Sequence, residues 1–321
     1  MNASADALRN RDAPPRRAPD FFIVGHPKSG TSALFQMLAA HPRLHMPRKE
    51  PHFFVPELGT RRARGTYEEY LDLFAGAGPD QLIGEATTSY LWSTGAAARI
   101  AQAQPDARIV AILREPASFL RSLHLQFLRS DVEDVSDLRR AIELQEERRA
   151  GRSIPRESTR PQMLVYGDHV RYVEQLRRYH AVFPREHVLV LIYEDFRANN
   201  EGTLQRVLGF LGVDDGSPLR TIEANHAAGV RAPRLAGLVR TLYLGREGSA
   251  QALKRTVKAV TSRRMRRSVM RGMRGAQREA PPAVDEPFMD ELRLRYKDEV
   301  VALSDYLGRD LVSFWGYEDL A

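Results

Sequence analysis

The stretch FFIVGHPKSGTS, residues 21–32, decides the fold. Its first four residues are apolar, which suits a strand buried on both faces of a parallel sheet. A turn of Gly, Pro and Ser follows, and the apolar spacing then becomes helical. The first N–H groups of such a helix lack backbone partners and carry partial positive charge, so this unit forms a cradle for an anion. Lys28 and the neighbouring hydroxyls add donors, and we expect a phosphate-like group to bind here.

The order of residues in this loop distinguishes two kinds of phosphate site. The common nucleotide loop reads G-x-x-x-x-G-K-[ST], with Lys directly after the last Gly. Here Lys28 precedes Gly30, and Thr and Ser follow without a Lys. The order Pro-Lys-Ser-Gly-Thr-Ser resembles the 5′-phosphosulfate loop of sulfotransferases that use 3′-phosphoadenosine 5′-phosphosulfate (PAPS). The alternative is a magnesium-dependent nucleotide kinase with a variant loop. The resemblance implies that PAPS is held by Pro27, Lys28, Ser29, Gly30, Thr31, Ser32 and Ala33.

A second strand and turn carry another candidate phosphate contact. The apolar run 108–113 is followed at once by Arg114, and Ser122 comes eight residues later on a helical pattern. The paired N–H groups of an Arg guanidinium, together with a hydroxyl, can hydrogen-bond the oxygens of a phosphate monoester. The unit resembles the family's 3′-phosphate motif, which implies that Arg114 and Ser122 hold the 3′-phosphate. A kinase would instead need Asp at this strand end. The structural alternatives are an ion pair of Arg114 with Glu115 or Glu85, and an exposed helix face for Ser122.

A third segment, RKEPHFF at residues 48–54, indicates a subgroup. It resembles the Lys-Glu-x-His-Phe-Phe element of heparan-sulfate-type and related bacterial sulfotransferases, in which the Glu is the proposed general base. An acceptor hydroxyl that attacks sulfur must lose its proton, and a positioned carboxylate can accept it. The resemblance assigns this role to Glu50. His52 and His124 are alternative bases, and a solvated loop charge paired with the preceding Arg or Lys is the structural alternative for Glu50.

Other segments extend the resemblance but depart from it at two positions. Residues 84–90, GEATTSY, resemble the Glu-Lys-Ser/Thr-Pro-Ala/Ser-Tyr segment of the heparan-type enzymes, with Ala86 in place of Lys and Thr88 in place of Pro. That Lys assists sulfuryl transfer or acceptor binding in the relatives, so its role here is absent or supplied elsewhere. Residues 193–196, the expected helix 204–211 and the segment 292–315 also resemble the family.

Composition excludes several classes of protein. The 321-residue chain is 43% hydrophobic, enough to bury a core, and contains no Cys. Disulfides, thiol catalysis and Cys-based zinc sites are therefore excluded. No apolar run reaches the ~18 residues of a membrane span. Residues 1–19 are charged and Pro-rich without an apolar centre, so they read as a flexible tail rather than a secretory signal. We expect a cytoplasmic protein, and the Ala and Arg richness suggests a bacterial one.

Strand candidates at 21–24, 81–84, 108–113 and 187–192 alternate with helical patterns. This alternation predicts an α/β fold, a single domain over residues 20–321 with a central parallel sheet flanked by helices. The family resemblance implies the P-loop-NTPase-like sulfotransferase version of that fold. Ligands bind beyond the carboxyl ends of the strands in such folds. Lys28 and Arg114 follow two of these ends, and Glu50 lies on a long loop after the first helix.

Two kinds of segment have no role in the donor motifs. The basic helical segment 245–283 includes residues 251–278, which are rich in Lys and Arg and lack acidic residues. It reads as a solvated helical face, as a surface for an anionic acceptor or a membrane, or, least favoured, as a nucleic-acid contact. Residues 139–162 read as an inserted lid or acceptor loop. Residues 225–234 are another candidate lid, in which Arg231 could close over the 3′-phosphate.

The sequence thus predicts a PAPS-dependent sulfotransferase. It would move a sulfuryl group to a hydroxyl or amine of a saccharide, glycolipid or secondary metabolite, with Glu50 as base, Lys28 on the leaving oxygen and no metal. The product of the donor would be adenosine 3′,5′-bisphosphate. The alternatives are a nucleotide-dependent small-molecule kinase and an inactive nucleotide- or polyanion-binding relative, for which Ala86 is the best argument. The acceptor and the oligomeric state are left open.

Overall fold

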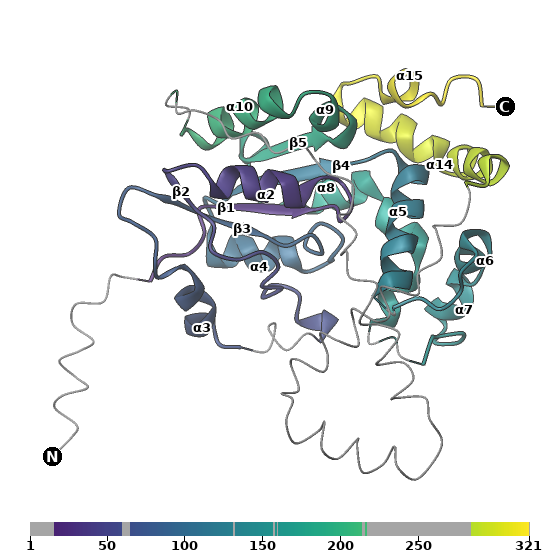
Figure 1. Ribbon diagram of the computed structural model, residues 1–321, viewed down its shortest axis with the longest axis horizontal. Coiled ribbons are helices and arrows are strands. Elements are labelled where there is room, and N and C mark those ends of the chain that lie inside the picture. The colour runs from purple at the N-terminus through teal and green to yellow at the C-terminus, as the bar shows by residue number, and fades with distance from the viewer. Residues whose placement is uncertain are drawn as a thin grey trace, which may run out of the picture. The chain divides into compact units, whose positions relative to one another are not determined.

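The computed structural model of the protein describes residues 16–59, 65–130, 132–156, 158, 160–213, 216 and 284–320. The chain divides into two compact units, Met1–Ala224 with Glu286–Ala321, and Asn225–Asp285. All elements below belong to the first unit (Figure 1). The candidate lid 225–234 with Arg231 and the basic segment 251–278 lie outside the described residues.

A five-stranded parallel sheet forms the centre of this unit, as predicted. The four expected strands are present, and a two-residue edge strand that the sequence did not indicate adds a fifth. In sheet order they are β2 Leu44–His45, β3 Leu82–Ala86, β1 Phe21–Gly25, β4 Arg108–Leu113 and β5 Val188–Ile192. Phe21 lies opposite Gly84 on one side and Arg108 on the other. A Cβ on Gly84 would lie 2.2 Å from the Phe21 ring, so only glycine fits there.

Helices cover both faces of the sheet because the side chains of β1 alternate between two cores. Phe22 and Val24 belong to one buried cluster, and Phe21 and Ile23 belong to the other. Figure 1 shows α2, α9 and α10 on one face and α4 and α8 on the opposite face. The longer helices of the first cluster are α4 Ala96–Ala103, α5 Pro116–Arg129, α8 Tyr172–His180 and α14 Glu286–Leu307. Those of the second are α2 Thr31–Ala39, α9 Tyr193–Ala198 and α10 Asn200–Leu211.

The direction in which the chain adds strands to the sheet reverses at β1. From β1 the chain builds β2 and β3 on one side of the sheet, and it then crosses to β4 and β5 on the other. All carboxyl ends lie at one edge because every pair is parallel. In open α/β sheets, ligands bind at such a switch point, outside the carboxyl ends of the strands. The loops after β1, β3 and β4 are therefore where a site is expected.

The segment 139–162, expected to be a lid, is partly anchored. It holds α6 Leu138–Glu143 and α7 Gln145–Arg149. Arg148 makes two hydrogen bonds of 2.7 Å to the Glu133 carboxylate, and both side chains are fully buried. Tyr166 donates a further bond to Glu133 at 3.0 Å. A buried pair is costly to break, so we do not expect this helical part to open as a unit.

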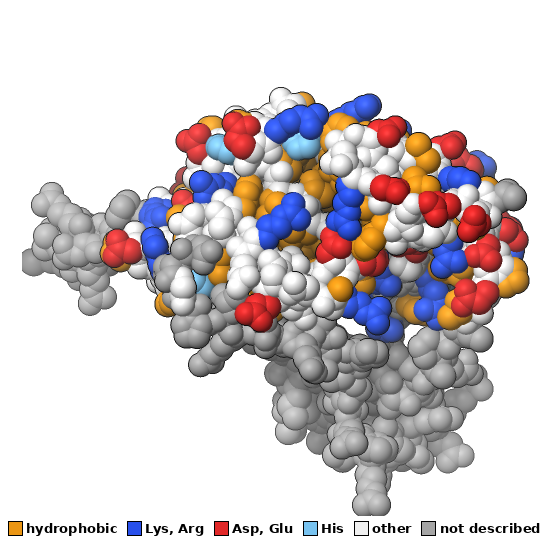
Figure 2. Space-filling model, turned by 90° about the horizontal axis from the view of Figure 1, so that it is seen from above, with side chains coloured by type: hydrophobic (Ala, Val, Ile, Leu, Met, Phe, Trp, Pro, Cys, Tyr) orange, Lys and Arg blue, Asp and Glu red, His pale blue; other side chains and the backbone are white. Residues whose placement is uncertain are grey.

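The remaining elements are α3 Tyr67–Leu71, α15 Leu311–Trp315 and short 3-10 turns. Arg16, in the expected tail, lies 2.6 Å from the Asp72 carboxylate, so the end of that tail contacts the domain. None of the helices in the described ranges is long and apolar enough to cross a bilayer. On the described part of the face in Figure 2, Lys and Arg are interspersed with Asp and Glu, so neither sign covers that face alone.

Candidate functional site

The N-terminus of α2 is open to an anion. Gly30 is its N-cap, its first turn contains no acidic residue, and no side chain among the described residues caps it. The Ala33 N–H donates to Gly30 O at 2.9 Å, while the first N–H groups of a helix in general have no partner within it and bring the positive end of the helix dipole. The predicted sequence of strand, glycine turn and helix is therefore present at the predicted residues.

Gly30 is required by both its backbone and its neighbours. Its φ is +83°, in the left-handed region. A Cβ at this position would lie 2.7 Å from Cδ1 of Phe196 in α9. The segment 193–196 thus packs directly against residues 27–33, the donor loop of the predicted site.

Positive charges gather around this loop. Burial lowers the pKa of Lys28, and the nearby Arg129, Arg114 and Lys49 lower it further. The backbone oxygen of Lys28 accepts a hydrogen bond from Arg114 Nη1 at 3.0 Å. The two candidate phosphate motifs, far apart in sequence, therefore meet at Lys28 and Arg114.

Arg114 is held by contacts other than an ion pair. Its Nε donates to Ser118 Oγ at 3.0 Å, and its guanidinium lies 4.7 Å from the centre of the Tyr193 ring. The two carboxylates named as alternative partners have other partners. Glu115 accepts bonds from the first N–H groups of α5, at 2.9 and 2.6 Å, and Glu85 accepts bonds from hydroxyls. The alternative of an Arg114 ion pair with either one is wrong.

Ser122 lies on the same side of α5 as the residue that contacts Arg114. Ser118 and Ser122 are one helical turn apart, a spacing that places side chains on one face. Ser122 is half-buried rather than exposed. The predicted pair Arg114 and Ser122 is thus on one β4–α5 unit, at the edge of the sheet where the donor loop lies.

Glu50 lies on a strained turn beside the end of β3. Its N–H donates to Ala86 O at 2.7 Å, and Lys49 forms an isolated parallel bridge with Ala86. Glu50 and His52 have φ values of +60° and +58°, which are uncommon for residues other than glycine. Such strain persists where surrounding contacts hold it, and it clusters at functional sites.

The Glu50 side chain is 39% exposed, and polar groups lie close to its carboxylate. Thr88 Oγ1 donates to Oε1 at 3.4 Å, Lys49 Nζ lies 3.6 Å from Oε1, and His52 Nε2 lies 3.7 Å from Oε2. The ion pair named as the structural alternative is therefore present with Lys49. The carboxylate also stays accessible, as a base must be.

The two candidate histidines have different surroundings. His52 is half-buried and makes a 3.1 Å hydrogen bond between Nδ1 and Ser89 Oγ. His124 is buried, with Nδ1 bonded to Tyr166 at 2.8 Å and Nε2 to the Ser136 carbonyl at 3.1 Å. Burial lowers the pKa of His124. Both of its ring nitrogens are used within the core, which favours a structural role.

The buried acid Glu85 forms a hydrogen-bond network next to the turn that carries Glu50. Glu85 accepts hydrogen bonds from Tyr70 and Thr87, both at 2.6 Å, and from Tyr90 at 3.2 Å. Burial raises its pKa to about 7. Thr87 Oγ1 also accepts a 3.4 Å bond from the His52 N–H. The end of β3 is thereby tied to the turn that carries the candidate base.

Two residues contribute to the site that the sequence did not indicate. Lys49 Nζ donates to Ser32 Oγ at 2.7 Å and lies 3.3 Å from Thr31 Oγ1. Tyr193 lies against the Arg114 guanidinium. Lys49 and Tyr193 both lie in segments that resemble the family, and a cation and an aromatic ring are residue types common in binding sites. Their contacts with Ser32 and Arg114 depend on the tertiary fold.

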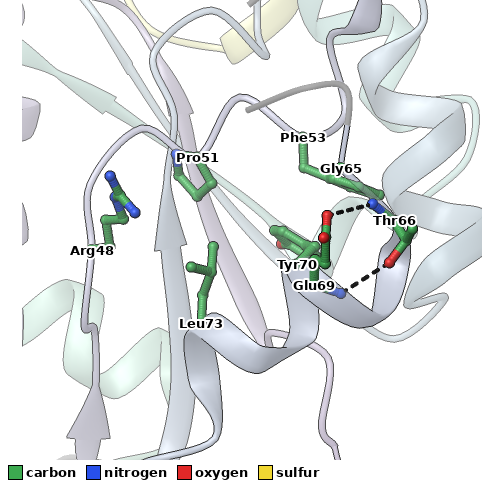
Figure 3. A pocket seen from close by; sticks show the side chains of 8 residues that line it. All are labelled: Arg48, Pro51, Phe53, Gly65, Thr66, Glu69, Tyr70 and Leu73. Atoms are coloured by element: carbon green, nitrogen blue, oxygen red, sulfur yellow. Dashed lines mark hydrogen bonds between the residues drawn. The ribbon is translucent and has the colours of Figure 1, made fainter. Parts of the chain in front are cut away.

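A pocket lies beside the same turn. Figure 3 shows Arg48 and Pro51 on one side and Tyr70, Thr66 and Glu69 on the other. Its volume is about 180 Å³. Phe53 stacks on Tyr70 with ring centres 4.5 Å apart, which gives the pocket an aromatic wall. The lining residues are Arg48, Pro51, Phe53, Gly65, Thr66, Glu69, Tyr70 and Leu73.

A metal site is not evident in the part of the chain that the structure describes, since it contains no group of three or more His, Asp or Glu side chains placed to hold an ion. The groups assembled around the donor loop are instead N–H donors, hydroxyls, ammoniums and a guanidinium. Such a set binds multiply charged anions.

The chain is similar to known proteins over most of the described fold. A family model described as "Sulfotransferase family" matches residues 19–216. Human Carbohydrate sulfotransferase 15 is 28% identical over 251 residues, covering 62% of this chain and 44% of that protein. Mouse Heparan sulfate glucosamine 3-O-sulfotransferase 3B1 is 28% identical over 200 residues, covering 62% and 47%. The chain thus spans less than half the length of these relatives.

A solved structure agrees over nearly its whole length. The crystal structure of a sulfotransferase from Alicyclobacillus acidocaldarius aligns with a TM-score of 0.63 at 25% identity. The alignment covers 92% of this chain and 98% of that one.

Proposed function

The chain belongs to the sulfotransferase family, and we propose that it transfers a sulfuryl group from PAPS to a hydroxyl or amine of a glycan or small-molecule acceptor. One observation carries the proposal: Lys28, Lys49 and Arg114 converge on the uncapped N-terminus of α2, at the switch point of the sheet. The site therefore favours a ligand with several negative charges, as PAPS has.

The two ends of PAPS would be bound by different kinds of protein group. Residues 27–33 would hold the 5′-phosphosulfate through the open helix N-terminus, the hydroxyls and Lys28. Arg114 and Ser122 would hold the 3′-phosphate by side chains, because the N-terminus of α5 is already capped by Glu115. This division is supported by the contrast between an open α2 and a capped α5.

The reaction would be an in-line displacement at sulfur. Lys28 would neutralise the bridging oxygen as the bond from sulfur to the leaving phosphate breaks. Glu50 would take the acceptor's proton as the new S–O bond forms. Much of the acceleration would come from holding both reactants in line. Support for Glu50 comes from its accessible carboxylate and from the polar neighbours that orient it.

We propose a saccharide as the acceptor class, since the curated relatives are named for carbohydrate and heparan sulfate substrates. The pocket beside the Glu50 turn would receive part of that acceptor. Its aromatic wall and few polar groups are typical of small-molecule sites.

Calorimetry with two ligands tests the donor. We expect adenosine 3′,5′-bisphosphate to bind tightly without magnesium, and magnesium-ATP to bind weakly or not at all. Tight magnesium-ATP binding with no bisphosphate binding would favour the kinase instead, although β4 is followed by Arg114 rather than by the Asp such an enzyme needs. Bisphosphate binding without any transfer would favour the inactive relative.

The cytoplasmic location stays a prediction from the sequence, and fractionation of the source cell would test it.

A further inference from the structure

Lys49 joins two parts of the site that come from distant segments. Its Nζ donates to Ser32 Oγ at 2.7 Å and lies 3.3 Å from Thr31 Oγ1, in the first turn of α2. The same atom lies 3.6 Å from Glu50 Oε1. One ammonium thus lies between the hydroxyls that would hold the donor and the carboxylate that would take the acceptor's proton.

The backbone fixes Lys49 in this place. It bridges to Ala86, and the next N–H donates to Ala86 O at 2.7 Å, so the chain here follows the end of β3. In extended backbone, consecutive side chains point to opposite faces. The left-handed conformation of Glu50 interrupts that alternation. The side chains of Lys49 and Glu50 therefore converge, as the 3.6 Å separation shows.

The charge on Lys49 is only partly compensated. The side chain is 22% exposed. Burial lowers the pKa of Lys49, and the neighbouring Glu50 carboxylate offsets part of that shift by raising it. Lys49 is also one of the cations that lower the pKa of Lys28. Two ammoniums near one helix N-terminus repel each other, and a multiply charged anion between them would relieve that repulsion.

We infer that Lys49 binds the sulfonate end of PAPS, an inference that rests on the proposed function. Lys28 acts on the bridging oxygen of the leaving phosphate, and Lys49 acts on the non-bridging sulfonate oxygens. The bond from sulfur to the bridging oxygen breaks, and that oxygen keeps the electron pair. The acceptor oxygen bonds to sulfur, and its proton goes to Glu50. The backbone of Lys49 also bridges to Ala86, the position at which the resembling segment carries Lys.

Comparing PAPS with adenosine 3′,5′-bisphosphate separates sulfonate binding by Lys49 from general donor binding. Lys49→Met removes the charge and keeps a long side chain. Without acceptor, its affinity for PAPS should fall by about tenfold, the loss expected for a charge-assisted hydrogen bond. Its affinity for adenosine 3′,5′-bisphosphate should fall clearly less than its affinity for PAPS, because that ligand lacks the sulfonate oxygens that Lys49 would bind. Lys49→Arg keeps the charge and should retain most of the preference for PAPS.

Arg43→Ala is the matched control, since Arg43 is an exposed cation on the same connection between α2 and the Glu50 turn. It should leave both affinities unchanged, which would exclude an effect of net charge. Equal losses for both ligands in Lys49→Met, or an unchanged PAPS affinity, would overturn the inference while leaving the proposed function standing. A wild-type protein that binds neither ligand would overturn both.

Discussion

Replacing Arg114 with Ala tests how the 3′-phosphate is held. Two of the guanidinium's N–H groups are committed, one to Ser118 and one to the Lys28 carbonyl. Among the described residues no carboxylate pairs with the guanidinium, and its other N–H groups remain for a ligand. Charge-assisted hydrogen bonds contribute about 1.5–3 kcal/mol, so affinity for adenosine 3′,5′-bisphosphate should fall about ten- to a hundredfold.

The assay compares two ligands by calorimetry. Adenosine 5′-phosphosulfate lacks the 3′-phosphate, and its affinity should change much less in Arg114→Ala. Equal losses for both ligands would refute the reasoning and would mean that Arg114 mainly supports the Lys28 loop. Ser122→Ala provides a second variant without that structural contact, and it should weaken only the bisphosphate. Matching melting temperatures would confirm that both variants are folded.

Three further outcomes are expected. Glu50→Gln should slow transfer by about 10²–10⁴-fold and keep donor affinity; a near-wild-type rate would exclude Glu50 as base. Because burial raises the pKa of Glu85 to about 7 from its ordinary 4.5, the folded state holds this proton more tightly, so stability falls as pH rises between those values. In Glu85→Gln the melting temperature should no longer fall as pH rises over this range. An unchanged pH dependence would contradict the assignment of the raised pKa to Glu85. Arg148→Ala should cost about 3–5 kcal/mol by leaving the Glu133 charge buried, whereas Arg140→Ala, in an exposed pair, should cost under about 1 kcal/mol; similar denaturation midpoints for the two variants would contradict this.

The donor side of the site could be predicted from sequence because its signals are local. The run 21–24 is apolar throughout, the turn after it contains Gly30, and the helix follows at once. The β4–α5 unit is equally compact, with Arg114 at the strand end and a Pro in the first helical turn. Each of these features is determined within about a dozen residues, where strand and helix patterns are most informative.

Long-range contacts could not be predicted in this way. The edge strand β2 has two residues, too few to show a pattern. The bond from Lys49 to Ser32 depends on the path of the Glu50 turn along β3, and the stacking of Tyr193 on Arg114 depends on the pairing of β4 with β5. The apolar pattern alone also did not reveal the pocket, whose walls come from two separate segments.

The central claim is sulfuryl transfer from PAPS, and a labelled donor tests it most directly. PAPS carrying labelled sulfur would be incubated with the protein, a panel of saccharides and an extract of the source cell. The account predicts label on a hydroxyl or amine of one acceptor class, adenosine 3′,5′-bisphosphate released in equal amount, and loss of both products in Lys28→Ala. Tight binding of the bisphosphate with no label transferred to any acceptor, or phosphate transferred from ATP instead, would contradict it.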